Sequence, residues 1–148
     1  MTRQKPASRR GEILQRAEEQ FAEYGYQGAS LSAIARAAGF GNPGLLHHFP
    51  SKAKLYRAVL EALAGDVTGR LEAGLAGQAD ARARLALFVN LQIDWIRARP
   101  HGFRVIQREL LDNAERVAAA QALPLRAYLL LGLDLIEAAQ RAGAARRD

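Results

Sequence analysis

Three histidines are the side chains of this sequence best suited to metal binding or proton transfer, and their spacing supports neither. His47 and His48 are adjacent, so on a helix their side chains diverge by about 100° and cannot hold one metal ion from the same face. His101 lies far along the chain, and the sequence has no cysteine. We also find no glycine-rich phosphate loop after a strand, no nucleophile elbow and no suitably spaced carboxylate pair. The sequence therefore predicts no metal site, no cofactor and no enzyme activity.

The histidine pair belongs to a segment of unusual composition, AGFGNPGLLHHFPSK, residues 38–52. Its first half holds the helix-breaking residues Gly39, Gly41, Pro43 and Gly44. Two leucines, the histidines and a phenylalanine follow, and then a proline, a serine and a lysine. Three interpretations compete: a histidine site, a plain loop, or the reading end of a nucleic-acid-binding helix.

The charge distribution bears on this choice. Residues 1–57 carry nine Lys and Arg against four Asp and Glu, a balance of +5, whereas residues 58–148 carry twelve against eleven. A basic N-terminal third suggests a polyanion partner for that part only, although a solvated basic face would look the same. We expect residues 1–8 to form a basic arm, which could enter a neighbouring minor groove, follow DNA phosphates or act only as a solubilising tail. No apolar run reaches the length of a membrane span, and we expect a cytoplasmic protein.

Helical spacing of apolar residues runs through the N-terminal third. A first helix is expected over residues 9–24, on an apolar stripe made of Ile13, Leu14, Ala17, Phe21 and Tyr24. Gly25 would then provide a left-handed exit. Ser30 would cap a second helix over residues 31–38, which Gly39 ends.

The breaker segment would join the second helix to a third through a steep turn. Only residues 39–41 separate the two helices, and a glycine-containing turn of this length is typical of a helix-turn-helix. Asn42 is the expected N-cap, with Pro43 at the first position of a helix that runs to Phe49. Leu45 and Phe49 would face the core. The outward face would consist of Gly41, Asn42, Gly44 and His47, with Leu46 at its edge.

The remaining sequence also predicts helices and no strand, so the expected fold class is all-α. Ser51 would cap a fourth helix over residues 52–63, and the glycines after it predict a frayed continuation and linker over 64–78. Further helices are expected over 80–99, 103–111 and 124–142, with a break at Pro100, His101 and Gly102. The helix over 80–99 is apolar on more than one face, so we expect it to be largely surrounded.

Residues 9 to about 60 resemble the DNA-binding domain of the TetR family of bacterial transcriptional regulators. The resemblance rests on the stretches FAEYGYQGASLSAIARAAG and LLHHFPSK taken together. The matching residues are Ile13, Ala17, Phe21, Gly25, Tyr26, Ser30, Leu31, Ile34, Ala35, Ala38, Gly39, Leu45, His48, Phe49, Ser51, Lys52 and Leu55. The resemblance implies a helix-turn-helix DNA-binding domain over 9–57 and a helical effector-binding and dimerisation domain over 58–148. It further implies a homodimer on an inverted-repeat operator, acting as a repressor that a small-molecule effector relieves.

The resemblance also implies roles for single residues. Ser30 and Lys52 would touch DNA phosphate, and His47 would be the DNA-facing member of the histidine pair. The family usually has serine or threonine where this chain has Gly41, and tyrosine where it has Leu46. Because these hydroxyls would ordinarily contact phosphate, we expect fewer contacts with the DNA backbone. Asn42 could pair with an adenine edge and Pro43 could pack on a thymine methyl. The full candidate DNA-binding set is Ser30, Arg36, Gly41, Asn42, Pro43, Gly44, His47 and Lys52.

The C-terminal part offers fewer signals. By the resemblance, candidate effector-pocket residues are Phe88, Trp95, Phe103 and Tyr128, although each taken singly could instead be ordinary core. Members of the family usually continue with two further helices that form the dimer interface, so we expect the body to be short at its C-terminus. The leucine-rich residues 123–136 are then a candidate replacement surface. An alternative function stays open: a helical ligand- or protein-binding module whose DNA binding is weak or lost.

Overall fold

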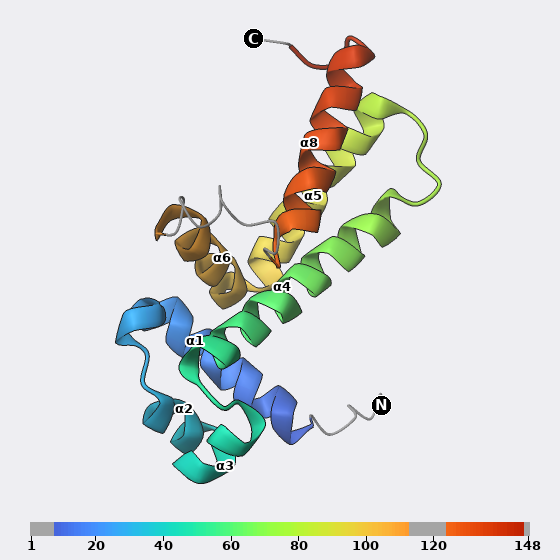
Figure 1. Cartoon of the computed structure of the whole chain (residues 1–148). Helices are drawn as coiled ribbons and strands as arrows, with labels where there is room; N and C mark the ends of the chain where they lie inside the picture. The colour runs from blue at the N-terminus through green and yellow to red at the C-terminus, as the bar shows by residue number, and fades with distance from the viewer. Residues whose placement is uncertain (1–7, 113–123, 147–148) are drawn as a thin grey trace. The chain divides into compact units, whose positions relative to one another are not determined.

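The computed structural model describes residues 8–112 and 124–146, and within these ranges the chain is helical with no strand. The helices are α1 (Arg9–Gly28), α2 (Leu31–Ala37), α3 (Asn42–His48), α4 (Lys52–Leu75), α5 (Ala81–Ala98), α6 (Pro100–Asp112) and α8 (Arg126–Arg141) (Figure 1). The expected all-α fold is therefore confirmed. The described residues divide into two compact units: residues 8–60 with 101–112 form the first, and residues 61–100 with 124–146 form the second.

Helix α1 provides the central apolar face of the first unit. Ser8 caps it, since its Oγ accepts a hydrogen bond from the Gly11 amide at 3.1 Å. Ile13, Ala17 and Phe21 are buried, as their spacing predicted. Tyr24, which we also placed on this stripe, is 58% exposed, so that part of the prediction was wrong. The basic arm expected over residues 1–8 lies outside the described residues, except for Ser8.

Gly25 interrupts α1 with a positive φ of 70° and a ψ of 179°. The positive φ expected at this glycine is confirmed. Its ψ is extended rather than left-handed helical, so the chain kinks and forms a further turn to Gly28 instead of leaving the helix at Tyr24. A side chain with a Cβ would be strained at this φ, which explains the glycine.

Helix α2 lies beside both α1 and α3 (Figure 1). Ser30 caps α2 as predicted, because its Oγ accepts from the Ala33 amide at 3.3 Å. Gly39 ends α2 with a φ of 75°, and the Phe40 amide donates back to the Ala35 carbonyl at 2.8 Å. Ile34 and Ala35 are the buried residues of α2, and Leu45 is that of α3.

Helix α4 begins as predicted and ends much later. The Oγ of Ser51 accepts from the Lys54 amide at 3.2 Å, so the expected cap is confirmed. The prediction of a frayed linker over 64–78 was wrong, because α4 continues to Leu75. Each glycine weakens a helix by about 1 kcal/mol, whereas burying each of Val67, Leu71 and Leu75 contributes about 1.5–3 kcal/mol. Packing therefore outweighs local propensity in this helix.

Helix α6 belongs to the first unit, although the predicted division at residues 57 and 58 assigned it to the second part. The break expected at residues 100–102 lies one residue earlier, at Arg99, because Pro100 already opens α6 and Gly102 is buried inside it. Proline is tolerated in the first turn, where its missing N–H has no helical partner to lose. Val105 and Ile106 are the buried apolar residues of α6.

The second unit pairs α5 with α8 (Figure 1). Asp80 caps α5, since its Oδ2 accepts from the Ala83 amide at 2.7 Å. The prediction that α5 is largely surrounded was wrong for the described residues, because Val89 is 47% and Ile93 40% exposed. On α8, Leu135 is buried while Leu133 is 55% exposed. Of the leucine-rich residues 123–136, Leu123 lies outside the described residues.

Candidate nucleic-acid interface

The third helix is held on the first unit by two apolar side chains. Leu45 is fully buried and Phe49 is 3% exposed, as their four-residue spacing predicted. The guanidinium carbon of Arg10 lies 4.5 Å from the centroid of the Phe49 ring, which adds a cation–π contact. A helix of only seven residues is thereby fixed from one side.

The other side of α3 faces solvent. Gly41, Asn42, Pro43 and His47 are exposed, and Leu46 is 43% exposed. His48 is half-buried, with its ring 5.9 Å from that of Phe40 in an edge-on arrangement. Of the two histidines, His47 is therefore the one available to an incoming molecule.

Gly44 is placed differently from the other members of the outward set. It is half-buried, and a Cβ at this position would lie 3.2 Å from Cδ1 of Phe40. The glycine therefore lets the Phe40 ring approach the backbone of α3 closely. The packing of Phe40 is therefore a sufficient reason for a glycine at position 44, without any role in contacting a ligand.

Asn42 corrects one prediction. The N-cap of α3 is Gly41, which makes no side-chain capping bond, and Asn42 is already the first helical residue. The carboxamide of Asn42 is directed elsewhere, since its Nδ2 donates to Oγ of Ser32 on α2 at 3.0 Å. Both side chains are exposed. Sequence reasoning missed Ser32, because residues ten apart meet only once the turn between the helices is known.

The candidate phosphate contacts Ser30 and Lys52, and Arg36 of the same candidate set, differ in how they are held. The Ser30 hydroxyl caps α2 and stays exposed, and Arg36 is exposed in the last turn of the same helix. Lys52 is half-buried at the start of α4. Its Nζ donates to the Gln27 carbonyl at 3.1 Å and lies 5.2 Å from the centroid of the Tyr26 ring. Lys52 is therefore held in place at the end of α1.

An aromatic cluster packs α1 against α4, and a hydrogen bond joins this cluster to α6. The rings of Phe21, Tyr26 and Tyr56 pack together, with centroids 4.9 Å apart for Phe21 and Tyr56 and 5.1 Å apart for the two tyrosines. The Tyr56 hydroxyl donates to Oε2 of Glu109 on α6 at 2.9 Å. Glu109 is 2% exposed, and its burial carried no signal in the sequence.

Arg108 of α6 binds the C-terminal end of the first segment of α1. Its Nε donates to the Ala22 carbonyl at 3.2 Å, and its terminal NH2 group donates to the Glu23 carbonyl at 3.3 Å. Carbonyls at the end of a helical segment lack partners within it, so a cation there satisfies them. Arg108 of α6 therefore binds the backbone carbonyls that precede the kink at Gly25.

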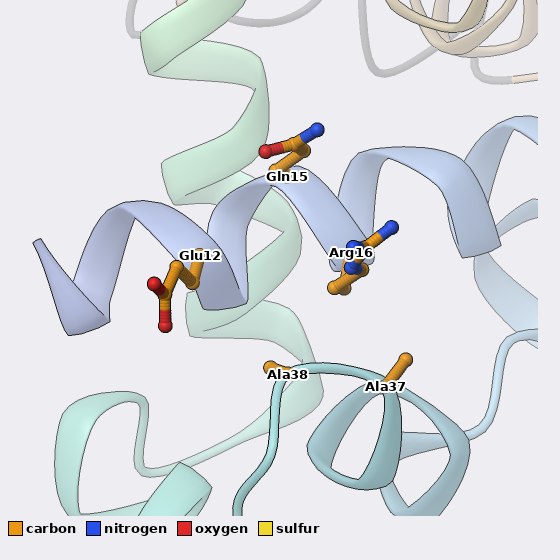
Figure 2. A pocket seen from close by; sticks show the side chains of 5 residues that line it. All are labelled: Glu12, Gln15, Arg16, Ala37 and Ala38. Atoms are coloured by element: carbon orange, nitrogen blue, oxygen red, sulfur yellow. The ribbon is translucent and has the colours of Figure 1, made fainter. Parts of the chain in front are cut away.

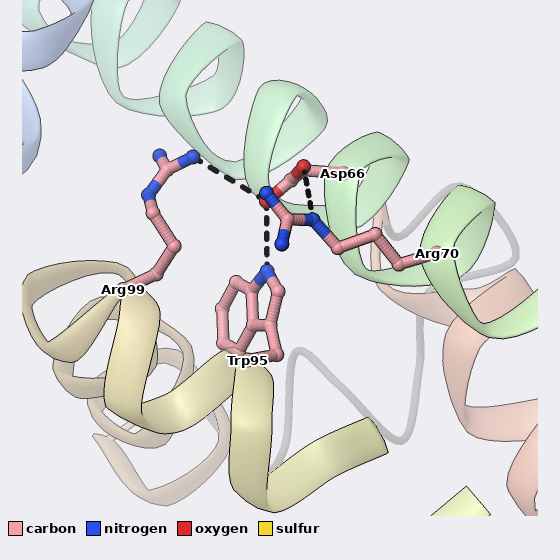
Figure 3. Close-up of polar contacts among 4 residues, drawn as sticks. All are labelled: Asp66, Arg70, Trp95 and Arg99. Atoms are coloured by element: carbon pink, nitrogen blue, oxygen red, sulfur yellow. Dashed lines mark hydrogen bonds and ion pairs between the residues drawn. The ribbon is translucent and has the colours of Figure 1, made fainter. Parts of the chain in front are cut away.

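Among the candidate pocket residues, Trp95 has the most defined surroundings (Figure 3). It is buried on α5, and its Nε1 donates to Oδ2 of Asp66 at 2.7 Å. Arg70 and Arg99 form ion pairs with the same carboxylate at 2.9 and 3.3 Å. Burial raises the pKa of Asp66, but the hydrogen bonds from Trp95 and Arg70 and the two positive charges outweigh it, so the pKa is lowered. This cluster joins α4 to α5.

The other pocket candidates are distributed over both units. Phe88 and Tyr128 lie half-buried on α5 and α8 in the second unit, whereas Phe103 lies on α6 in the first. The Phe88 ring packs on Gly132, where a Cβ would lie 3.2 Å away. Burial raises the pKa of the Tyr128 hydroxyl, and the nearby Gln92 side chain opposes this rise. Nε2 of Gln92 is buried and has no hydrogen-bond partner among the residues that the structure describes.

A shallow hollow of about 260 Å³ lies between α1 and the end of α2 (Figure 2). It is lined by Glu12, Gln15, Arg16, Ala37 and Ala38, so no predicted pocket residue contributes to it. Within residues 8–112 and 124–146, no three histidine or carboxylate side chains gather closely enough to hold a metal ion. In the same ranges no helix has the length and apolar composition needed to cross a membrane.

The geometry of α2 and α3 defines a helix-turn-helix domain: a short turn, a recognition-type helix fixed by two apolar residues, and a polar outer face. Residues 13–59 match the family described as bacterial regulatory proteins, tetR family. The chain is 34% identical to the transcriptional activator FasR of Mycolicibacterium smegmatis over 128 residues, 86% of this chain and 58% of FasR. It is 30% identical to the transcriptional repressor KstR2 of Rhodococcus jostii over 144 residues, 96% of this chain and 70% of KstR2. The chain belongs to the TetR family, as the resemblance indicated.

Solved structures show the same fold. The fatty acid degradation regulator FadR from Bacillus halodurans superposes with a TM-score of 0.75 at 23% identity, covering 99% of this chain and 74% of FadR. A TetR-like transcriptional regulator from Rhodococcus sp. RHA1 superposes with a TM-score of 0.76 at 19% identity, covering 96% and 76%. The chain spans 58% of the length of FasR and 48% of that of the Escherichia coli regulator RutR.

Proposed function

We propose that this chain acts as a sequence-specific DNA-binding transcriptional regulator, as a homodimer on an inverted-repeat operator. The observation that carries the proposal is the arrangement of α3. Leu45 and Phe49 are buried and anchor this helix, while Asn42, Pro43 and His47 are exposed. A helix held in this way can enter the major groove without losing its own support.

In this proposal the phosphate and base contacts come from different positions. Ser30, Arg36 and Lys52 contact phosphates, with backbone contributions at Gly41 and Gly44. Asn42, Pro43 and His47 face base edges. The excess of basic residues over 1–57 favours approach to a polyanion, and it makes binding dependent on salt.

We propose that the regulator is a repressor relieved by a small-molecule effector. Support comes from the likeness to the repressor KstR2, which extends over 96% of this chain. Activation is the second candidate, because the relative with the higher identity is the activator FasR. The selected operator is placed upstream of a reporter gene, and the chain is expressed in the same cells. A fall in reporter expression indicates a repressor, and a rise indicates an activator.

The effector would bind the helical part over residues 58–148, which would also form the dimer. Phe88, Trp95 and Tyr128 are the proposed lining residues in the second unit, and Phe103 is a further candidate on α6. We place the protein in the cytoplasm, where its DNA target lies, and assign it no catalytic role.

Selection of bound fragments from sheared genomic DNA by the full chain tests the proposed function. We expect enrichment of a palindromic sequence, with binding that weakens steeply between two salt concentrations. Failure to enrich any sequence at low salt would contradict DNA recognition. It would favour instead a helical ligand- or protein-binding module.

A further inference from the structure

Ser32 and Asn42 form a side-chain bridge between the two helices of the helix-turn-helix. Nδ2 of Asn42, at the first position of α3, donates to Oγ of Ser32, near the start of α2, at 3.0 Å. Both residues lie on the exposed surface of the first unit. The bridge is therefore open to solvent, although Leu45, three residues after Asn42, is fully buried.

The bridge leaves part of the Asn42 carboxamide available. A carboxamide carries two N–H donors and an acceptor oxygen, and Ser32 takes one donor. One N–H and Oδ1 remain. A donor next to an acceptor is the pair that matches N7 and the N6 amino group of adenine in the major groove.

The bridge also restricts the conformation of Asn42. An exposed asparagine at the start of a helix would otherwise sample several rotamers, and ordering a free side chain on binding weakens an interface. A side chain that is already held loses less freedom when it meets a base. Gly41 and not Asn42 occupies the N-cap, so capping of α3 does not fix this side chain.

We propose that Ser32 is a positioning residue for base recognition, which acts by holding the Asn42 carboxamide toward an adenine-containing base pair. This inference rests on the proposed DNA-binding function. Ser32 itself contacts no base in this arrangement. Its effect on specificity passes through Asn42.

The test uses the full chain and a randomised DNA duplex library. Sequences are selected with the unmodified protein and with Ser32→Ala, Ser32→Thr and Asn42→Ala. Affinities are then measured for the selected duplex and for duplexes that carry each single base-pair change. Thermal melting of each variant checks that the first unit is folded.

We expect Asn42→Ala to abolish discrimination at one base pair of each half-site, an effect of roughly 5- to 150-fold. Ser32→Ala should lower discrimination at that same base pair by roughly 2- to 10-fold, the usual effect of freeing one side chain. Ser32→Thr keeps the hydroxyl and should keep the discrimination. In the Asn42→Ala background, Ser32→Ala should change nothing further.

Three results would overturn the inference alone. Ser32→Ala could leave discrimination at the Asn42-dependent base pair unchanged, or Asn42→Ala could alter no preference. Ser32→Ala could also weaken all duplexes equally and flatten the salt dependence by about one unit, which would make Ser32 a phosphate contact. An unmodified chain that enriches no sequence would overturn the proposed function, and this inference with it.

Discussion

The hydroxyl of Tyr56 on α4 donates a hydrogen bond of 2.9 Å to the buried carboxylate of Glu109 on α6. The two residues are 53 positions apart in the chain, so this bond joins α6 to the DNA-binding elements through tertiary structure alone. The Tyr56 ring also packs against Phe21 and Tyr26. One side chain therefore connects α1, α4 and α6 within the first unit.

Tyr56→Phe should destabilise the first unit by about 1–3 kcal/mol, because a buried carboxylate loses one of its donors while the ring packing is kept. Urea unfolding followed by circular dichroism measures the change. Tyr24→Phe is the matched control, since Tyr24 is 58% exposed, and it should have almost no effect. Equal effects of the two substitutions would contradict a stabilising role for the buried hydrogen bond.

Glycines within α4 should respond differently to alanine. Among the described residues, a Cβ built at Gly69 would meet no atom within 4 Å apart from its chain neighbours and its own helix backbone, so Gly69→Ala should stabilise the protein by about 0.5–1 kcal/mol through helix propensity. A Cβ at Gly74 would lie 2.6 Å from Cδ1 of Leu91, so Gly74→Ala should stabilise less or destabilise. Urea unfolding of both variants ranks them. A larger gain from Gly74→Ala would show that α4 and α5 are not closely packed at this point.

The helix-turn-helix could be predicted from the sequence because its signals are local. Ser30 caps α2, Gly39 ends it, and the four-residue spacing of Leu45 and Phe49 places both in the core. The N-cap of α3 was assigned one residue too late. Gly41 takes that position, and Asn42 binds Ser32 across the turn.

The features that the sequence did not reveal depend on contacts between distant residues. The length of α4 follows from burial of Val67 and Leu71, which offsets its glycines. The burial of Glu109 follows from Tyr56. Val67, Leu71 and Leu75 do recur at a four-residue spacing, but their burial depends on packing partners, and no periodicity or cap encodes the burial of Glu109.

Asp66 should make the stability of the second unit sensitive to acid. Its pKa is below the ordinary value of 3.8 in the folded chain. The stabilisation that the ionised Asp66 side chain provides is therefore fully present above pH 3.8, and it is lost as the pH falls through the lower pKa of the folded chain. Asp66→Asn should reduce stability at pH 7 and make the decline between pH 5 and pH 2 shallower. Thermal melting across this range measures both effects, and Asp134→Asn, at an exposed position, is the control. Parallel pH profiles of Asp66→Asn and the unmodified chain would contradict the assignment.

Lys52→Ala should weaken binding to all DNA sequences alike and flatten the log–log dependence of affinity on salt by about one unit, because one phosphate contact is lost. The Gln27 carbonyl and the Tyr26 ring hold the Lys52 side chain in one position. Its removal should therefore cost one phosphate contact at a defined place. Lys54→Ala removes the same charge two residues further on, from an exposed side chain, and is the control. Fluorescence anisotropy at several salt concentrations gives the slopes. If both variants change the slope equally, the effect is one of net charge, and Lys52 is not a specific contact.

Phe49→Ala and His47→Ala should separate the structural side of α3 from its binding side. Phe49 is 3% exposed and packs under Arg10, so its truncation should destabilise the first unit by about 3–5 kcal/mol. His47 is exposed, so His47→Ala should leave the melting temperature almost unchanged and weaken DNA binding. Melting is followed separately in each unit, by Trp95 fluorescence for the second and by a label at Tyr24 for the first. A His47→Ala variant that melts early but binds DNA normally while folded would make His47 a packing residue, and α3 would then need another contact to read DNA.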